Sequence, residues 1–356
     1  MDVDEEESSR STSCVALSRE PRVAQLLAAV PFVVPFAQRV ALFHSLVEQD
    51  RCAHQRDAHI VGTRVRISRE RLFDDAFEAL ATLAPSQLKD RVQVTFVNEF
   101  GREEAGIDGG GVFKEFLDEL TKAAFDPATS SLFCSTAAGA LYPSPDVSLA
   151  LRRFGGTARG RLERFEFCGR IIGKALYERV LVEPRFARFF LNKALGKYNA
   201  FDDLQSLDSV LYAQLGSLKK MDARQLDQLA LTFEITALCP ATGAARDVEL
   251  TQGGRHLKVT AQNRSRYVQL VAHHKLNVQQ AQPSQAFLRG LRAVVPNRWL
   301  KMFNPEELQI LVSGTDAPID VQDWKNNAHY GGFSNLNPQS THISTHPSVY
   351  IYIYIL

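Results

Sequence analysis

Apolar residues recur at the three- and four-residue spacing of amphipathic helices along most of this chain. The pattern predicts helices, in chain order, over residues 23–30, 36–47, 72–80, 112–120, 165–176, 185–195 and 262–295. Strand-like alternation of apolar and polar residues is confined to 61–67, 92–97 and two short runs, 229–235 and 248–250. We therefore expect an α+β fold that is mainly α.

Changes in composition divide the chain into segments. Residues 1–20 are polar and acidic and are predicted to form a disordered leader, and 21–90 read as a helical lead-in. The pattern of a folded domain extends over 91–334. Within it, 201–258 mixes short helices with the two alternating runs and is predicted to be a small α/β subdomain. Residues 335–356, rich in Asn, Ser, Thr, Pro and His, are predicted to be a disordered tail.

The charge balance argues against two classes of partner. The chain has 41 Lys and Arg against 40 Asp and Glu, so its formal net charge is +1, whereas a nucleic-acid-binding protein normally has a strong basic excess. No apolar run reaches the roughly 18 residues that a membrane helix needs. The acidic N-terminus also differs from a secretory or transit peptide. We expect neither nucleic acid nor a membrane as a partner.

The five cysteines lie far apart, at Cys14, Cys52, Cys134, Cys168 and Cys239. An odd number without a CxxC pair fits a reducing compartment, so cytoplasmic or nuclear localisation is expected. Cys168 lies on the apolar stripe of a predicted helix and is interpreted as an inert core thiol. Cys134 and Cys239 lie near turns, without basic neighbours arranged to lower a thiol pKa.

A glycine-rich stretch, Gly106 to Gly111, precedes a predicted helix and invites a phosphate-binding interpretation, because helix N-termini attract anions. However, neither GxxxxGK[ST] nor GxGxxG is present, and Glu103, Glu104 and Asp108 would repel phosphate. We instead expect the glycines to allow a sharp start of the helix, with Asp108 as its cap.

Two further clusters are interpreted as ordinary surface features. The first is a group of arginines that we expect to form a solvated loop and helix start: Arg152, Arg153, Arg159, Arg161 and Arg164. The second is a set of histidines without carboxylates or cysteines at ligand spacing: His54, His59, His273 and His274. A zinc site needs about four organised ligands, so no metal site is predicted.

Seven sequence blocks, taken together and in this order, resemble the N-terminal lobe of the HECT domain of ubiquitin-protein ligases. They are EAGIDGGGVFKEFL (104–117), LYPSP (141–145), FEFCGRIIGKALYERVLVEPRFARFFL (165–191), LDSVLYAQL (207–215), VTAQNRSRYVQLVAHHKLN (259–277), RWLKMFNPEELQILVSGTDAPIDVQDW (298–324) and HYGGFS (329–334). The lead-in VPFVVPFAQRVALF (30–43) also resembles the segment that precedes this domain in one branch of such ligases.

The resemblance implies a two-lobe enzyme without cofactor or metal. Its N-terminal lobe docks a ubiquitin-conjugating enzyme. Its C-terminal lobe carries a cysteine, in a Thr-Cys-Phe/Met-Asn-like motif, that accepts ubiquitin as a thioester and passes it to a lysine of a protein substrate. This chain contains no such motif, only 22 residues follow Ser334, and none of the five cysteines matches the catalytic position. We therefore expect a truncated chain that has no catalytic residue and is inactive alone.

The docking groove of the family can be transferred residue by residue. Its apolar lining corresponds here to Leu211, Leu215, Met221 and Leu229, with Tyr267 from the following helix. Leu211 and Leu215 are four residues apart and so share a helical face. The alternative is that these side chains fill the core of the subdomain itself.

Two other functions stay open at this point. The chain could be a non-catalytic interaction module that sequesters conjugating enzymes and competes with intact ligases. It could also be a truncated product without function, because a lobe that lacks its partner lobe leaves apolar surface exposed.

Overall fold

The computed structural model describes residues 29–57, 62–98, 100–104, 111–145, 158–238 and 245–315. All described helices and strands belong to a unit that ends at Gly314. The predicted leader, the tail after Ser334, the glycine-rich stretch up to residue 110, His59, Cys14 and Cys239 lie outside the described residues. The segment boundaries predicted from composition stay predictions.

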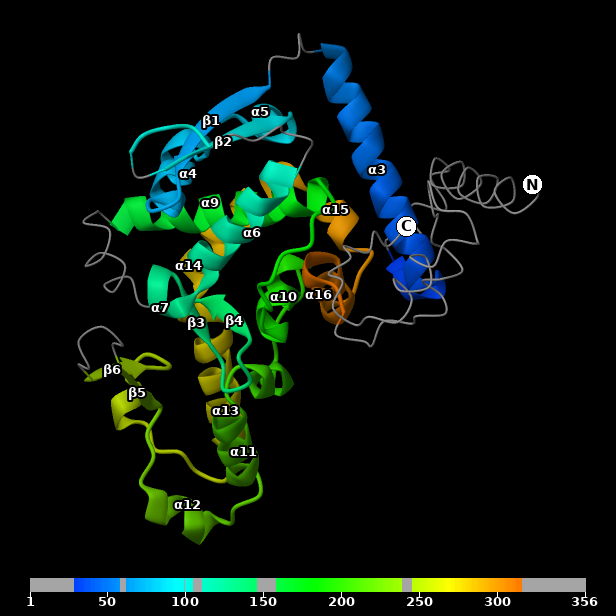
Figure 1. Cartoon of the computed structure of the whole chain (residues 1–356). Helices are drawn as coiled ribbons and strands as arrows, with labels where there is room; N and C mark the ends of the chain where they lie inside the picture. Colours follow the sequence, from blue (N-terminus) through cyan, green and yellow to red (C-terminus); the bar gives the residue numbers. More distant parts are fainter. Residues whose placement is uncertain are drawn as a thin grey trace, which may run out of the picture. The chain divides into compact units, whose positions relative to one another are not determined.

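Helices dominate the described residues, as the sequence predicts (Figure 1). The α-helices are α3 (Phe36–Asp57), α4 (Leu72–Leu80), α5 (Pro85–Lys89), α6 (Gly111–Phe125), α7 (Pro127–Ser130), α9 (Ala158–Tyr177), α10 (Arg188–Ala194), α11 (Ser209–Leu218), α12 (Ala223–Leu229), α13 (Arg264–His273), α14 (Ala281–Val294), α15 (Asn297–Leu300) and α16 (Pro305–Ser313). The part of the chain that the structure describes also contains the 3-10 turns η1 (Pro31–Val33), η2 (Phe201–Ser206) and η3 (Gly254–His256) and the π-helical turn η4 (His274–Val278).

Within the described ranges, the strands form three two-stranded sheets. They are β1 (Thr63–Ser68), β2 (Val92–Val97), β3 (Phe133–Ser135), β4 (Leu141–Pro143), β5 (Glu234–Leu238) and β6 (Ala245–Glu249). β1 and β2 are parallel, with Thr63 opposite Val92, and α4 and α5 connect them, as the crossover of a parallel pair requires. β3–β4 and β5–β6 are antiparallel.

The centre of the lobe is the packing of α9 against α14 (Figure 1). The predicted stripe on α9 is confirmed, because Phe165, Cys168, Ile171, Ile172, Ala175 and Leu176 are all buried. Glycines let the two backbones approach unusually closely. A Cβ atom on Gly169 would lie 1.9 Å from the carbonyl oxygen of Phe287, and one on Gly290 would lie 1.8 Å from that of Glu166. The close packing of α9 against α14 therefore requires glycine at both positions.

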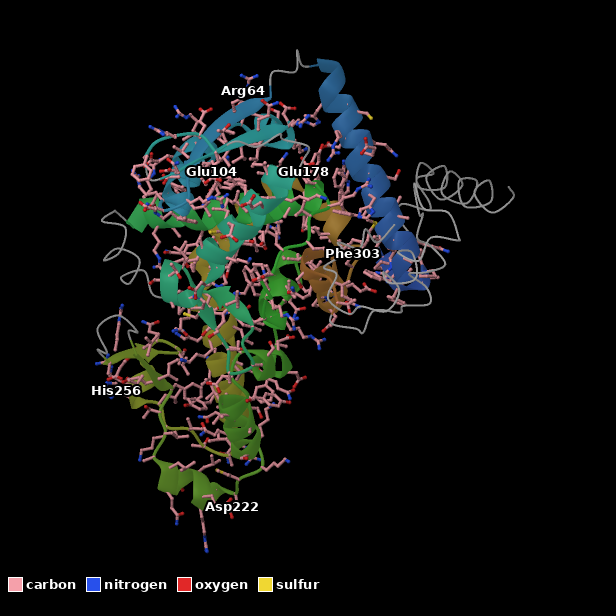
Figure 2. All side chains as sticks on the ribbon, viewed as in Figure 1. Arg64, Glu104, Glu178, Asp222, His256 and Phe303 are labelled. Carbon is pink, nitrogen blue, oxygen red and sulfur yellow. The ribbon has the colours of Figure 1, made fainter. Side chains whose placement is uncertain are left out.

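Helix α3 packs on the lobe as the lead-in pattern predicts. Val40, Phe43 and Val47 are buried, and the ring of Phe43 meets the edge of Trp299 and of Phe303, which is labelled in Figure 2. The helix that carries these residues is thus an integral part of the fold.

Arg39 fastens the first turn of α3 to α16. Its guanidinium forms two hydrogen bonds to the carboxylate of Glu307, of 2.6 and 2.5 Å, and one of 2.6 Å to the carbonyl of Met302. Glu307 also accepts from the backbone N–H of Asn304, in the capping box that starts α16. This charged group links residues more than 260 positions apart.

The arginine cluster is not the solvated surface that the sequence suggested. Arg161 is only 4% exposed and donates to the carbonyl of Ser144. Arg164 pairs with Asp74 at 3.1 Å and lies over the ring of Phe77. Only Arg159 matches the expectation, as an exposed partner of Glu163. Arg152 and Arg153 lie outside the described residues. The planar guanidinium stacks on aromatic rings and donates several hydrogen bonds, which allows arginine to be buried here.

Two element boundaries also differ from the sequence prediction. The run 229–235 was expected to be a strand, but Leu229 ends α12 and the strand β5 begins only at Glu234. The long helix predicted over 262–295 is divided into α13, η4 and α14. Apolar spacing does not show such breaks, because a π-helical turn preserves a near-helical pattern.

Among the described residues, no helix is both long and apolar enough to cross a lipid bilayer.

Candidate docking surface

The segment predicted to be a small subdomain, residues 201–258, contains the turn η2 followed by the helices α11 and α12 (Figure 1). Asp208 caps α11 by accepting the N–H of Leu211 at 2.9 Å. Asp222, labelled in Figure 2, and Gln225 form a reciprocal capping box at the start of α12. Because both helices are short, these caps contribute much of their local stability.

A hairpin forms the other half of the small subdomain. β5 and β6 pair from Glu234 with Glu249 to Leu238 with Ala245. Arg255 pairs with Glu249 at 2.6 Å, which lowers the pKa of that carboxyl, and both side chains lie on the surface. The turn η3, which contains His256 (labelled in Figure 2), then returns the chain towards α13.

Two of the five predicted docking residues are buried, Leu215 within the small subdomain and Tyr267 on the following helix α13. Tyr267 is 7% exposed and its ring meets that of Phe233 edge-on, with centroids 5.4 Å apart. Burial raises the pKa of the Tyr267 hydroxyl. Leu215, on α11, is 5% exposed. Both side chains therefore hold the subdomain together, in agreement with the alternative that the sequence left open for them.

The other three predicted docking residues are more accessible. Leu211 and Met221 are half-buried against the core, whereas Leu229 is 45% exposed at the end of α12. The carbonyl of Met221 accepts a hydrogen bond from Arg264, on the first turn of α13. α11, which carries Leu215, also packs on α13, the helix that carries Arg264 and Tyr267. Leu229 is the last residue of α12.

Two further apolar side chains of the small subdomain are exposed and were not selected from the sequence. Val210 is 65% exposed on the first turn of α11, and Leu257 is 40% exposed after η3. No sequence pattern distinguishes them, because a single apolar residue in a polar stretch occurs at many ordinary surface positions.

Aromatic and charged side chains hold α11 against the turn η2. The rings of Phe201 and Tyr212 lie 4.8 Å apart, and the Lys219 ammonium lies 3.6 Å from the centre of the Phe201 ring. A cation at this distance is attracted by the ring face. These contacts fix η2 against α11 and so hold the half-buried face of α11 in place.

The described cysteines have different environments. Cys168 is fully buried, and burial raises the pKa of its thiol, which confirms its assignment to the core. Cys134 is half-buried in β3 opposite Tyr142, and Cys52 is exposed on α3 with Glu48 as its neighbour. An acidic neighbour does not favour a thiolate, which is the form that reacts.

In the part of the chain that the structure describes, no three His, Cys, Asp or Glu side chains gather as metal ligands would. His273 is instead hydrogen-bonded to the hydroxyl of Tyr198 at 2.9 Å, and His54 to the carbonyl of Asp50 at 2.8 Å.

The sequence of this chain is similar to a known family model and to several known proteins. The family model described as HECT-domain (ubiquitin-transferase) matches residues 118–346. The chain is 38% identical over 317 residues to E3 ubiquitin-protein ligase UPL6 of Arabidopsis thaliana, an alignment that covers 89% of this chain and 30% of that protein.

Two other relatives show the same extent of similarity. Ubiquitin-protein ligase E3B of Homo sapiens is 36% identical, with 89% of this chain and 30% of that protein covered. E3 ubiquitin-protein ligase HUL5 of Saccharomyces cerevisiae is 37% identical, with 88% and 35% covered. The chain thus spans about a third of the length of the curated relatives that it matches.

Proposed function

Because the chain belongs to the HECT-domain (ubiquitin-transferase) family, we propose that it acts in protein ubiquitination by binding a ubiquitin-conjugating enzyme through its small subdomain. The observation that carries this proposal is the exposure of Leu229 at the end of α12, together with half-buried Leu211 and Met221. Ubiquitin, as the cargo of the conjugating enzyme, and protein substrates are the further partners that this role implies.

The proposed surface is small and mainly apolar, so we expect weak and transient binding dominated by one or two side chains. Leu229 is the natural anchor, because it is already positioned by a capped helix and still exposes almost half of its side chain. Leu211 and Met221 would form the floor on which the partner side chain rests. The buried side chains of Leu215 and Tyr267 would support this surface by holding α11 and α13 together.

A charge at the anchor position should weaken docking. Leu229→Asp is expected to weaken binding of a ubiquitin-conjugating enzyme at least about tenfold, because a carboxylate would have to be desolvated against an apolar partner. Titration calorimetry or fluorescence anisotropy measures the dissociation constant.

Leu181→Asp is the matched control, since Leu181 is 46% exposed but lies outside the small subdomain. We expect this variant to bind like the parent chain. Equal binding by Leu229→Asp and the parent would contradict the assignment of Leu229.

We further propose that the cysteines of this chain do not carry ubiquitin. Cys168 is buried, and exposed Cys52 has the acidic Glu48 as its neighbour, which does not favour a thiolate. Incubation of the chain with charged conjugating enzyme, without reducing agent, should give no adduct that a thiol cleaves. A thiol-sensitive adduct mapped by mass spectrometry to any of the five cysteines would refute this proposal.

A further inference from the structure

A buried polar network lies where the chain enters the small subdomain. Asn192, on α10, is 6% exposed, and its amide nitrogen donates to Asn199 Oδ1 and to Asp203 Oδ1, both at 2.9 Å. Asn199 is 1% exposed and donates to the carbonyl of Phe189 at 2.8 Å. Buried amides that are satisfied on several sides define one arrangement of the chain, because any shift leaves a polar group without a partner.

The network extends to the turn η2. Asp203 accepts the N–H of Ala200 at 2.8 Å with its second oxygen, and Ser206 accepts the N–H of Phe189 at 3.2 Å. The turn η2 is therefore tied to Phe189, Asn192 and Ala200, in the segment that precedes the small subdomain.

The same network reaches the segment through which the chain leaves the small subdomain. Asn277, in the π-helical turn η4, donates to the carbonyl of Asn199 at 3.1 Å. One turn earlier, His273 is hydrogen-bonded to Tyr198. The segment that enters the small subdomain, at Tyr198 and Asn199, is thus hydrogen-bonded to the segment that leaves it, at His273 and Asn277. π-helical turns are rare and are frequent at functional sites, and this one separates α13, against which α11 packs, from α14 of the lobe centre.

We propose that Asn192 and Asn277 are positioning residues that hold the small subdomain in one orientation relative to α10 and α14. This inference rests on the proposed docking function, since its consequence is that a bound conjugating enzyme is presented in a fixed direction. The docking residues themselves lie elsewhere, on α11, α12 and the segment between them. Loss of the network should therefore change orientation and leave the affinity for the conjugating enzyme unchanged.

Distance measurement between two nitroxide labels tests the proposal in the full chain. The labels are attached at Gln228→Cys on α12 and Gln285→Cys on α14, both exposed positions, with all native cysteines except Cys168 replaced by serine. We expect a narrow distance distribution in this parent and a broad one in Asn192→Leu and in Asn277→Leu. Gln205→Leu, at an exposed position of η2, is the control and should stay narrow.

Two further readouts separate positioning from loss of the fold. Hydrogen exchange of the amides of Ala200 and Asp203 should accelerate about tenfold in Asn192→Leu, the factor that corresponds to 1.4 kcal/mol, while α9 and α14 amides keep their protection. Asn277 is less buried than Asn192, so Asn277→Leu decides the matter if Asn192→Leu does not fold. Affinity for the conjugating enzyme is measured on the same proteins.

The outcomes are distinct. Broad distributions with unchanged affinity and protected α9 and α14 support the positioning role. Narrow distributions in the folded variants, broadening in Gln205→Leu, or broadening that occurs only with loss of α9 and α14 protection would overturn it. A parent chain that binds no conjugating enzyme would refute the proposed function, whereas the distance distributions would still decide whether the network sets the orientation.

Discussion

Gly290→Ala is expected to destabilise the lobe by more than about 3 kcal/mol, the upper end of the usual cost of overpacking a core. The added Cβ would lie 1.8 Å from the carbonyl oxygen of Glu166 and 2.9 Å from the backbone nitrogen of Arg170. Both atoms belong to the backbone of α9, so no side chain can rotate away. The helices would have to separate along their whole contact, and the apolar surface of both would lose its packing. Thermal or urea unfolding followed by circular dichroism measures the loss.

Gly216→Ala provides the matched control. Gly216 lies inside α11, and an added Cβ would have no heavy atom within 4 Å. Alanine favours the helix over glycine by roughly 0.5–1 kcal/mol, so this variant should be slightly more stable than the parent. If Gly290→Ala unfolded at the same temperature as the parent, the close approach of α9 and α14 would be wrong.

Arg39→Met should cost about 3 kcal/mol, because it removes the guanidinium that donates to a partly buried carboxylate and to two carbonyls. The side chains of Arg39 and Glu307 are 5% and 16% exposed, and the guanidinium also donates to Val34 and Met302. Arg159→Met is the control, since Arg159 and its partner Glu163 are 90% and 54% exposed. An exposed pair contributes at most about 1 kcal/mol, so this control should unfold close to the parent. Equal unfolding midpoints of the two variants would contradict the role of Arg39 in holding α3 against α16.

The same pair predicts a dependence of stability on pH. The hydrogen bonds from Arg39 hold the pKa of Glu307 below its usual value. A carboxyl whose pKa is lower in the folded state stabilises the fold above its unfolded pKa, about 4.3, and loses this contribution as the pH falls through the folded pKa. The difference in unfolding free energy between the parent and Arg39→Met should therefore shrink when the pH is lowered from 7 to 3. A constant difference over that range would show that Glu307 does not titrate through this pair.

The sequence predicts the helical stripes well because each is a local pattern. The predicted stripe residues of α9, and Val40, Phe43 and Val47 of α3, are buried. The sequence does not predict what lies opposite each stripe. Gly169 and Gly290 are 121 positions apart, and nothing local reveals that each meets the backbone of the other's helix. The burial of Arg161 could not be predicted from the sequence for the same reason, because it depends on a hydrogen-bond partner, Ser144, that the local pattern does not identify.

For a related reason, the sequence predicted the candidate docking surface only in part. The resemblance identifies five apolar positions, but it does not separate Leu215 and Tyr267, which are buried in the core, from Leu229, which is exposed. That distinction depends on where α12 ends and on how α11 packs against α13. The polar network around Asn192 was not predictable, because Asn, Asp and Ser in such a segment usually indicate an exposed turn.

The central claim is that the small subdomain docks a ubiquitin-conjugating enzyme. Titration of such an enzyme into the methyl-labelled chain, followed by NMR, tests it most directly. We predict saturable shifts of the methyl groups of Leu211, Met221 and Leu229, while those of Leu181 stay unchanged. Absence of saturable shifts at these three residues, or equally large shifts at Leu181, would contradict the account.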